Sequence, residues 1–214
     1  MQAKLQRQQA MTDARRGLVL DAARAVFADA GIEGASIREI ARRAGYTPGA
    51  IYSYFESKEA IYAALLDESL ERLRTAVADA RVFKNAPAKT LAAKAHAWFD
   101  FYASHPRELD LGFYLVHGMR PRGLNSTLDH ALNDRLREAL RPCEDALQSM
   151  GLDAAHALQE NTSLFAHGVG LLLMRHTGRI RMFGQSAEDL FKRYLDQLVV
   201  RLAAQATASI GGTV

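Results

Sequence analysis

The sequence has a single cysteine, Cys143, among its 214 residues. One cysteine can form neither an internal disulfide nor a multi-cysteine zinc cluster, and it suits a reducing compartment. No apolar run approaches the length that spans a bilayer, and the polar start MQAKLQRQQAMTDARR lacks the apolar core of a secretory signal. These absences predict a cytoplasmic protein with no membrane partner.

The motifs of common enzyme classes are also missing. The chain contains no G-x-S-x-G, P-loop, H-E-x-x-H or C-x-x-C motif, and the GVG at 168–170 lacks both a third glycine and a preceding strand. The seven histidines show no convincing metal-ligand spacing. We therefore expect no enzymatic activity, no catalytic residue, no cofactor and no bound metal.

Alternating runs of β-branched residues are absent, whereas helical periodicity and helix caps recur along the whole chain. The pattern predicts an all-α protein of about nine helices. It indicates a small N-terminal domain over residues 1–56, a larger helical domain over 57–206 and a flexible tail over 207–214. After the first three helices, which fall within 12–56, the predicted helices are 57–82, 88–104, 106–117, 124–149, 153–176 and 186–204.

The formal net charge of +3 is unevenly distributed. Residues 1–58 hold 9 Lys and Arg against 6 Asp and Glu (9 − 6 = +3), and the rest of the chain holds 18 of each sign (27 − 9 and 24 − 6). This excess indicates either a surface that binds a polyanion or an ordinary solvated basic face.

The stretch SIREIARRAGYTPGAIYSYF, residues 36–55, contains two short helical patterns separated by a turn. Ser36 and Glu39 form a capping box for the first helix, Gly45 ends that helix, and Thr47 caps the next one. Two short helices joined in this way are typical of a helix-turn-helix, whose second helix enters the major groove of DNA.

The candidate DNA contacts lie on this helix pair. Tyrosines at helical spacing are more often core residues, and we prefer that interpretation for Tyr46 alone. Because one such helix covers only a few base pairs, we expect a dimer on a palindromic operator. The groove-facing residues would be Thr47, Pro48 and Gly49; contacts mainly to phosphates would come from Ser36, Tyr52, Tyr54 and Lys58, and Arg38 would contact either a base or the backbone.

The stretch from Val19 to Leu65 closely resembles the DNA-binding domain of the TetR/AcrR family of transcriptional regulators. The resemblance implies a homodimeric, ligand-responsive repressor, in which residues 1–56 are the helix-turn-helix DNA-binding domain and residues 57–206 bind the effector and dimerise. A purely architectural DNA binder is the alternative, but the neutral, aromatic-rich C-terminal part is larger than dimerisation requires. The matching residues are Ser36, Ile40, Ala41, Ala44, Gly45, Gly49, Tyr52, Phe55 and Lys58.

Two further sites are expected in the C-terminal part. Aromatic residues in the helices predicted at 88–104 and 106–117 either form an ordinary core or line a pocket for a small hydrophobic or aromatic effector. The pocket candidates are Trp98, Tyr102, Phe113, Tyr114 and His117. The last two long helices carry more apolar surface than one intramolecular face needs, which predicts a dimer interface through Gly168, Leu172, Phe191, Leu195 and Leu198.

The N-terminal end carries four basic residues, Lys4, Arg7, Arg15 and Arg16. They could form an arm that follows the DNA backbone or enters the minor groove. A disordered tail without DNA contacts is the alternative.

Overall fold

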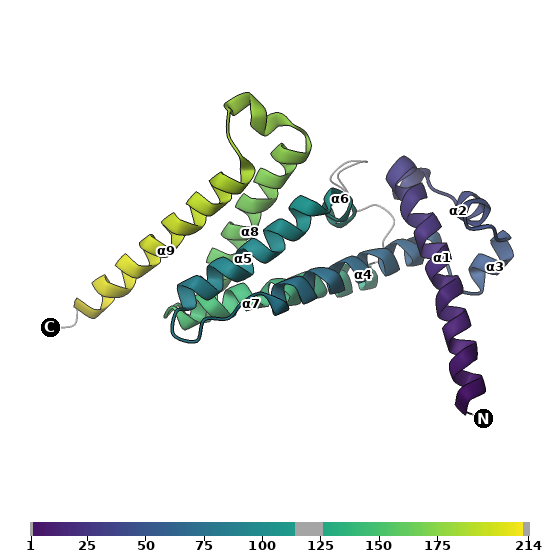
Figure 1. Ribbon diagram of the computed structural model, residues 1–214, viewed down its shortest axis with the longest axis horizontal. Coiled ribbons are helices and arrows are strands. Elements are labelled where there is room, and N and C mark those ends of the chain that lie inside the picture. Colours follow the sequence, from purple (N-terminus) through teal and green to yellow (C-terminus); the bar gives the residue numbers. More distant parts are fainter. Residues whose placement is uncertain (1, 114–125, 212–214) are drawn as a thin grey trace. The chain divides into compact units, whose positions relative to one another are not determined.

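The computed structural model describes residues 2–113 and 126–211, and every regular element in these two segments is a helix (Figure 1). The all-α prediction is confirmed. The chain divides into two compact units: unit 1 comprises Met1–Ser69 with Arg107–Asn133, and unit 2 comprises Leu70–Pro106 with Asp134–Val214. This division reflects packing alone, so the functional boundary expected at residues 56 and 57 stays a prediction.

Unit 1 is built around α1 (Gln2–Gly34), α2 (Ile37–Ala44) and α3 (Pro48–Tyr52), together with the start of α4 (Lys58–Asp79) and α6 (Pro106–Phe113). Its core follows from the helical spacing of apolar side chains, because residues three and four apart share one helix face. Phe27 packs edge-on against Tyr62, with ring centroids 5.3 Å apart. The other fully buried side chains of this core include Val19, Ala23, Ile40, Ala41, Ile51, Ile61 and Leu65.

Helix α1 is longer than the sequence pattern predicts. It begins at Gln2 rather than near residue 12, and all side chains of residues 2–16 are exposed. Apolar periodicity could not reveal these turns, because they bury nothing. The structure therefore places the four basic N-terminal residues on a helix and not in a disordered tail.

Unit 2 contains α5 (Pro87–Ser104), most of α7 (Ser126–Ser149), α8 (Ala154–His176) and α9 (Ala187–Gly211). In Figure 1, α8 and α9 are joined by a short 3-10 helix, η2 (Arg179–Phe183), which the sequence did not predict. Helix α7 continues through Pro142 without splitting. Helix α9 extends to Gly211, so the first residues of the predicted tail are helical.

The core of unit 2 is aromatic. Phe99 of α5 stacks on Phe191 of α9 with ring centroids 4.1 Å apart and an interplanar angle of 12°. Trp98 contacts both of these rings and also Phe165 of α8. Trp98, Phe99 and Phe191 are at most 1% exposed, so three helices meet in one buried aromatic layer.

A buried lysine caps the C-terminal end of α4 within unit 2. The Lys94 ammonium, on α5, donates to the carbonyl oxygens of Val77, Ala78 and Ala80 at 2.8, 2.8 and 2.7 Å. The last carbonyls of a helix have no partner within the helix, and a cation there also complements the helix dipole. Burial lowers the pKa of Lys94. The sequence did not reveal this contact, because the two helices are separate elements in the chain.

Candidate nucleic-acid interface

The start of α2 is held by half of the predicted capping box. Ser36 has extended backbone angles, and its hydroxyl oxygen accepts from the backbone N–H of Glu39 at 3.2 Å. The Glu39 carboxylate does not reach back to the cap. It accepts two hydrogen bonds from Arg42, at 3.0 and 2.6 Å, and these bonds hold the pKa of Glu39 below its usual value.

The turn between α2 and α3 depends on one left-handed residue. Gly45 has φ 73° and ψ 27°, a conformation that costs glycine almost nothing. The backbone N–H of Tyr46 then donates to the carbonyl of Ala41 at 2.9 Å, which ends α2 and turns the chain sharply. Tyr46 itself is half-buried in this turn.

Helix α3 is only five residues long, yet it has two distinct sides. The Thr47 hydroxyl caps it by accepting from the N–H of Ala50 at 3.3 Å, and Pro48 occupies the first turn, where no N–H is needed. Ile51 is fully buried beneath the helix. Thr47, Pro48, Gly49 and Tyr52 are exposed, and Tyr54 is half-buried. One side of α3 thus anchors the helix in the core, and the other side is exposed to solvent.

The structure brings the DNA-contact candidates of the sequence into this one part of unit 1. Ser36 and Arg38 are exposed at the start of α2, next in the chain to the α1–α2 connection. Lys58 has a role that the sequence did not show: its ammonium donates to the carbonyls of Glu33 and Ala35, both at 3.1 Å. An ammonium has three donors, so the phosphate contact of Lys58 stays a prediction beside this structural role.

Most cationic side chains on α2 and on the neighbouring helices of unit 1 already form ion pairs. Arg42 binds Glu39, Arg43 binds Asp29 at 2.9 Å, and Arg24 binds Glu68 at 3.2 Å. Arg38 has no ion-pair or hydrogen-bond partner among the described residues. It is therefore the arginine of α2 whose charge is available to a ligand.

The described effector candidates fall in both units, and their role stays a prediction. Trp98 and Tyr102 are at most 1% exposed in the core of unit 2, and Phe113 ends α6 in unit 1. Tyr114 and His117 lie outside the described residues. Sequence reasoning missed Asn161 of α8, which is 6% exposed and one helical turn before Phe165. The sequence signal that could have identified Asn161 is its position as a polar residue among the apolar residues on one side of α8.

The side chains proposed for the dimer interface are buried inside the single chain. Leu172, Phe191, Leu195 and Leu198 are at most 2% exposed. A Cβ atom on Gly168 would lie 2.2 Å from the Trp98 ring, so this glycine is needed for packing of α5 on α8. The choice of these five residues as a surface for a second copy was therefore wrong, because apolar periodicity identifies buried positions without saying what buries them.

Within residues 2–113 and 126–211, both membrane-spanning helices and metal-ligand clusters are absent. No helix there is long and apolar enough to cross a membrane. No three His, Cys, Asp or Glu side chains there come together as metal ligands. The lone Cys143 is buried between α5 and α7, and burial raises the pKa of its thiol to about 12.

Comparison with known proteins supports the geometry of α1 to α4. Residues 19–65 match the family model described as bacterial regulatory proteins, tetR family. The chain is 34% identical over 158 residues to the HTH-type transcriptional regulator BetI of Cronobacter sakazakii, covering 65% of this chain and 77% of BetI.

Solved structures agree in fold. The putative regulatory protein SCO4313 superposes with a TM-score of 0.72 at 20% identity, over 89% of this chain and 97% of the other. FadR of Bacillus subtilis, solved in complex with stearoyl-CoA, gives a TM-score of 0.62 at 23% identity, over 85% and 96%. With a BetI match that extends well beyond the helix-turn-helix, the chain belongs to the TetR family of bacterial transcriptional regulators.

Proposed function

We propose that this protein is a transcriptional repressor that binds a palindromic operator as a dimer and leaves it when a small hydrophobic or aromatic effector binds. TetR-family regulators are ligand-responsive DNA-binding proteins, usually repressors, and they work as dimers. The observation that carries the proposal is the two-sided α3, with Ile51 buried below and Thr47, Pro48 and Gly49 open above.

The proposed DNA contacts divide by what each group can do. The exposed face of α3 suits the major groove, because no heavy atom lies within 4 Å of a Cβ built on Gly49 and the backbone can approach a base edge closely. The Tyr52 hydroxyl, on a side chain that is 57% exposed, can donate to a phosphate. Ser36, Tyr54 and Lys58 would add backbone contacts, and Arg38 supplies the unpaired positive charge.

The first test compares two arginines of α2. A duplex is first enriched from a random library with the full-length protein, and an inverted repeat is expected. Arg38→Ala should then weaken binding to it by roughly tenfold, because α2 and α3 then lack their unpaired cation. Arg42→Ala is the matched control: its charge is already paired with Glu39, so anisotropy titrations should show a much smaller effect.

Equal effects of the two substitutions would contradict this assignment of the surface. A wild-type protein that enriches no duplex would contradict the proposed function itself.

We propose that the effector is recognised in unit 2 by Trp98 and Asn161. The Trp98 indole nitrogen and the Asn161 amide oxygen are buried, and neither has a hydrogen-bond partner of normal geometry among the described residues. The Trp98 N–H does lie close enough to Cys143 to act against the rise in the thiol pKa. A ligand with one acceptor, one donor and an apolar body would satisfy both groups. FadR of Bacillus subtilis, which is similar in fold, was solved with stearoyl-CoA, a ligand with a long apolar acyl chain.

We further propose that dimerisation uses the outer faces of α8 and α9. Ala166 and Gly170 of α8 are exposed, and a Cβ on Gly170 would meet nothing within 4 Å, so a partner helix could approach the backbone there. Val200 of α9 is 69% exposed. Arg201 binds Glu160 at 2.9 and 2.7 Å, which ties the two helices together as one surface. This replaces the buried residues chosen from the sequence.

A further inference from the structure

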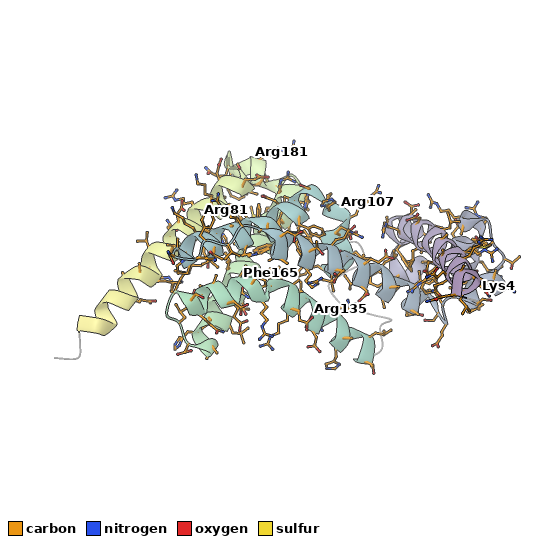
Figure 2. The ribbon with its side chains drawn as sticks, turned by 60° about the horizontal axis from the view of Figure 1, so that its bottom comes forward. Lys4, Arg81, Arg107, Arg135, Phe165 and Arg181 are labelled. Carbon is orange, nitrogen blue, oxygen red and sulfur yellow. The ribbon has the colours of Figure 1, made fainter. Side chains whose placement is uncertain are left out.

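Apart from a contact between Arg16 and the Phe55 ring, the first four turns of α1 project from unit 1 with their side chains exposed. Every side chain from residue 2 to residue 16 is exposed, and the first fully buried residue of the helix is Val19. In Figure 1 these dark purple turns extend past α2 and α3, and Figure 2 labels Lys4 near their end. We call residues 2–16 the N-terminal extension. Its turns contribute nothing to the core, so any use they have involves a partner.

The extension accounts for the net charge of the whole protein. Residues 1–18 contain four basic residues and one acidic residue (4 − 1 = +3), and the remaining residues contain 23 of each sign (27 − 4 and 24 − 1). An exposed helical segment that carries all of the excess positive charge has the electrostatic character of a polyanion-binding surface.

Three of these cations lie on one side of the helix. At 100° per residue, Lys4, Arg7 and Arg15 fall within an arc of about 80°, whereas Asp13 lies on the opposite side. None of the three has an ion-pair or hydrogen-bond partner among the described residues. Lys4 and Arg15 are about 16 Å apart along the axis, so the cations can reach phosphates on both sides of a minor groove about 6 Å wide.

The extension leaves unit 1 beside the proposed DNA surface. The Arg16 guanidinium lies 5.0 Å from the ring centroid of Phe55, three residues after the end of α3. This contact places the base of the extension near the C-terminal end of α3. Arg16 lies about 100° around the helix axis from Arg15, so the contact fixes where the extension leaves unit 1 and not the direction of its basic side.

The helix-turn-helix itself has little free charge to offer DNA. Between residues 19 and 58, Arg24, Arg42 and Arg43 are held by carboxylates, and Lys58 is held by two backbone carbonyls. Arg38 is the remaining cation of that segment. Phosphate contacts by cations supply most of the non-specific part of DNA affinity, so α2 and α3 alone would bind weakly.

We propose that the N-terminal extension is a second DNA-binding element, which lays Lys4, Arg7 and Arg15 against the phosphates that flank the half-site bound by α3. The inference rests on the proposed function, because it needs α3 to dock on the duplex first. It assigns the extension to duplex DNA and not to a protein partner.

The test neutralises the basic side and keeps the helix. The variant Lys4→Gln, Arg7→Gln, Arg15→Gln is compared with a control triple in unit 2, Arg179→Gln, Arg181→Gln, Lys192→Gln, which changes the net charge equally at exposed positions. The probe is the duplex enriched by the wild-type protein, with ten flanking base pairs on each side. The affinity of the N-terminal triple should fall at least tenfold, and its salt slope should fall by about 0.9 for each phosphate that the protein no longer neutralises.

A second duplex, without the flanking base pairs, locates the contact. The wild type should bind the short duplex as weakly as the N-terminal triple binds the long duplex. The N-terminal triple should bind the short and the long duplex with equal affinity. The control triple should follow the wild type on both duplexes, and circular dichroism should show equal helix content in all three proteins.

Unchanged affinity and salt slope in the N-terminal triple, on a duplex that the wild type binds tightly, would overturn this inference and leave the proposed function intact. Equal weakening in the two triples would also overturn it, since net charge alone would then explain the effect. Failure of the wild type to enrich any duplex would overturn both proposals together.

Discussion

Asn161 is a polar residue at a position where the spacing of α8 requires an apolar one. Its neighbours on the same side, Ala157 and Leu164, are fully buried, and Asn161 is 6% exposed. Its amide nitrogen donates weakly to the carbonyl of Leu140 at 3.4 Å, while its amide oxygen has no partner among the described residues. A buried, half-satisfied amide lowers the stability of the unliganded protein, which is tolerable if a ligand completes its hydrogen bonds.

This cost gives a prediction at the scale of one side chain. Asn161→Leu, which keeps the number and branching of the side-chain heavy atoms, should leave the free energy of unfolding unchanged or raise it by about 1 kcal/mol, because a poorly satisfied polar group is removed. The same variant should still bind the operator but should no longer be released by the effector. Urea unfolding and effector titration of the DNA complex measure the two properties, with Gln159→Leu, exposed on the same helix, as control.

Strong destabilisation of Asn161→Leu combined with a normal effector response would show that this asparagine serves the core and not the ligand.

At the scale of elements, the end of α4 depends on a side chain from another helix. The three carbonyls bound by Lys94 belong to the last turn of α4 and the residue after it. Lys94 is 4% exposed, so its charge was moved out of water to make these bonds. That desolvation offsets part of what the bonds contribute.

We expect Lys94→Met to cost about 1 to 3 kcal/mol of unfolding free energy, because the carbonyls stay buried without a donor while the aliphatic stem is kept. Hydrogen exchange should accelerate at the amides of the last turn of α4. Lys89→Met, exposed on the same helix, should change neither property. Normal exchange protection in the Lys94 variant would show that other contacts hold the end of α4.

The elements were largely predictable, and the contacts between them were not. Gly45 and Thr47 mark helix ends by local chemistry, and both act as expected. The Lys94 contact and the packing of Gly168 on Trp98 depend on which helices meet. Helical periodicity does not contain that information, so the proposed DNA surface could be outlined from sequence while the interior contacts could not.

At the scale of the whole molecule, the dimer decides whether two DNA-binding surfaces can act together. Gly168 and Gly170 are two residues apart on α8, but Gly168 faces the core and Gly170 is open. Two copies related by a two-fold axis would pack their α8 and α9 helices into one four-helix interface made of identical surfaces. The open face is therefore where a second copy should bind.

Gly170→Arg combined with Val200→Arg should give monomers, because like charges from both copies would be buried at the interface without partners. Light scattering gives the mass, and the monomer should keep its helix content while losing cooperative binding to an inverted repeat. Val82→Glu, at a side chain that is 62% exposed between α4 and α5, should remain dimeric. A double variant that is still dimeric would place the interface on another surface.

The position of Trp98 also has a spectroscopic consequence. It is the single tryptophan of the chain, fully buried among phenylalanine rings and next to the Cys143 thiol. Excitation at the red edge of the indole band avoids the tyrosines of the helix-turn-helix, so the emission reports on unit 2 alone. An apolar surrounding shifts that emission to the blue, and any molecule that reaches the indole nitrogen alters it. The protein thus contains an intrinsic fluorophore at the place where its effector is proposed to bind.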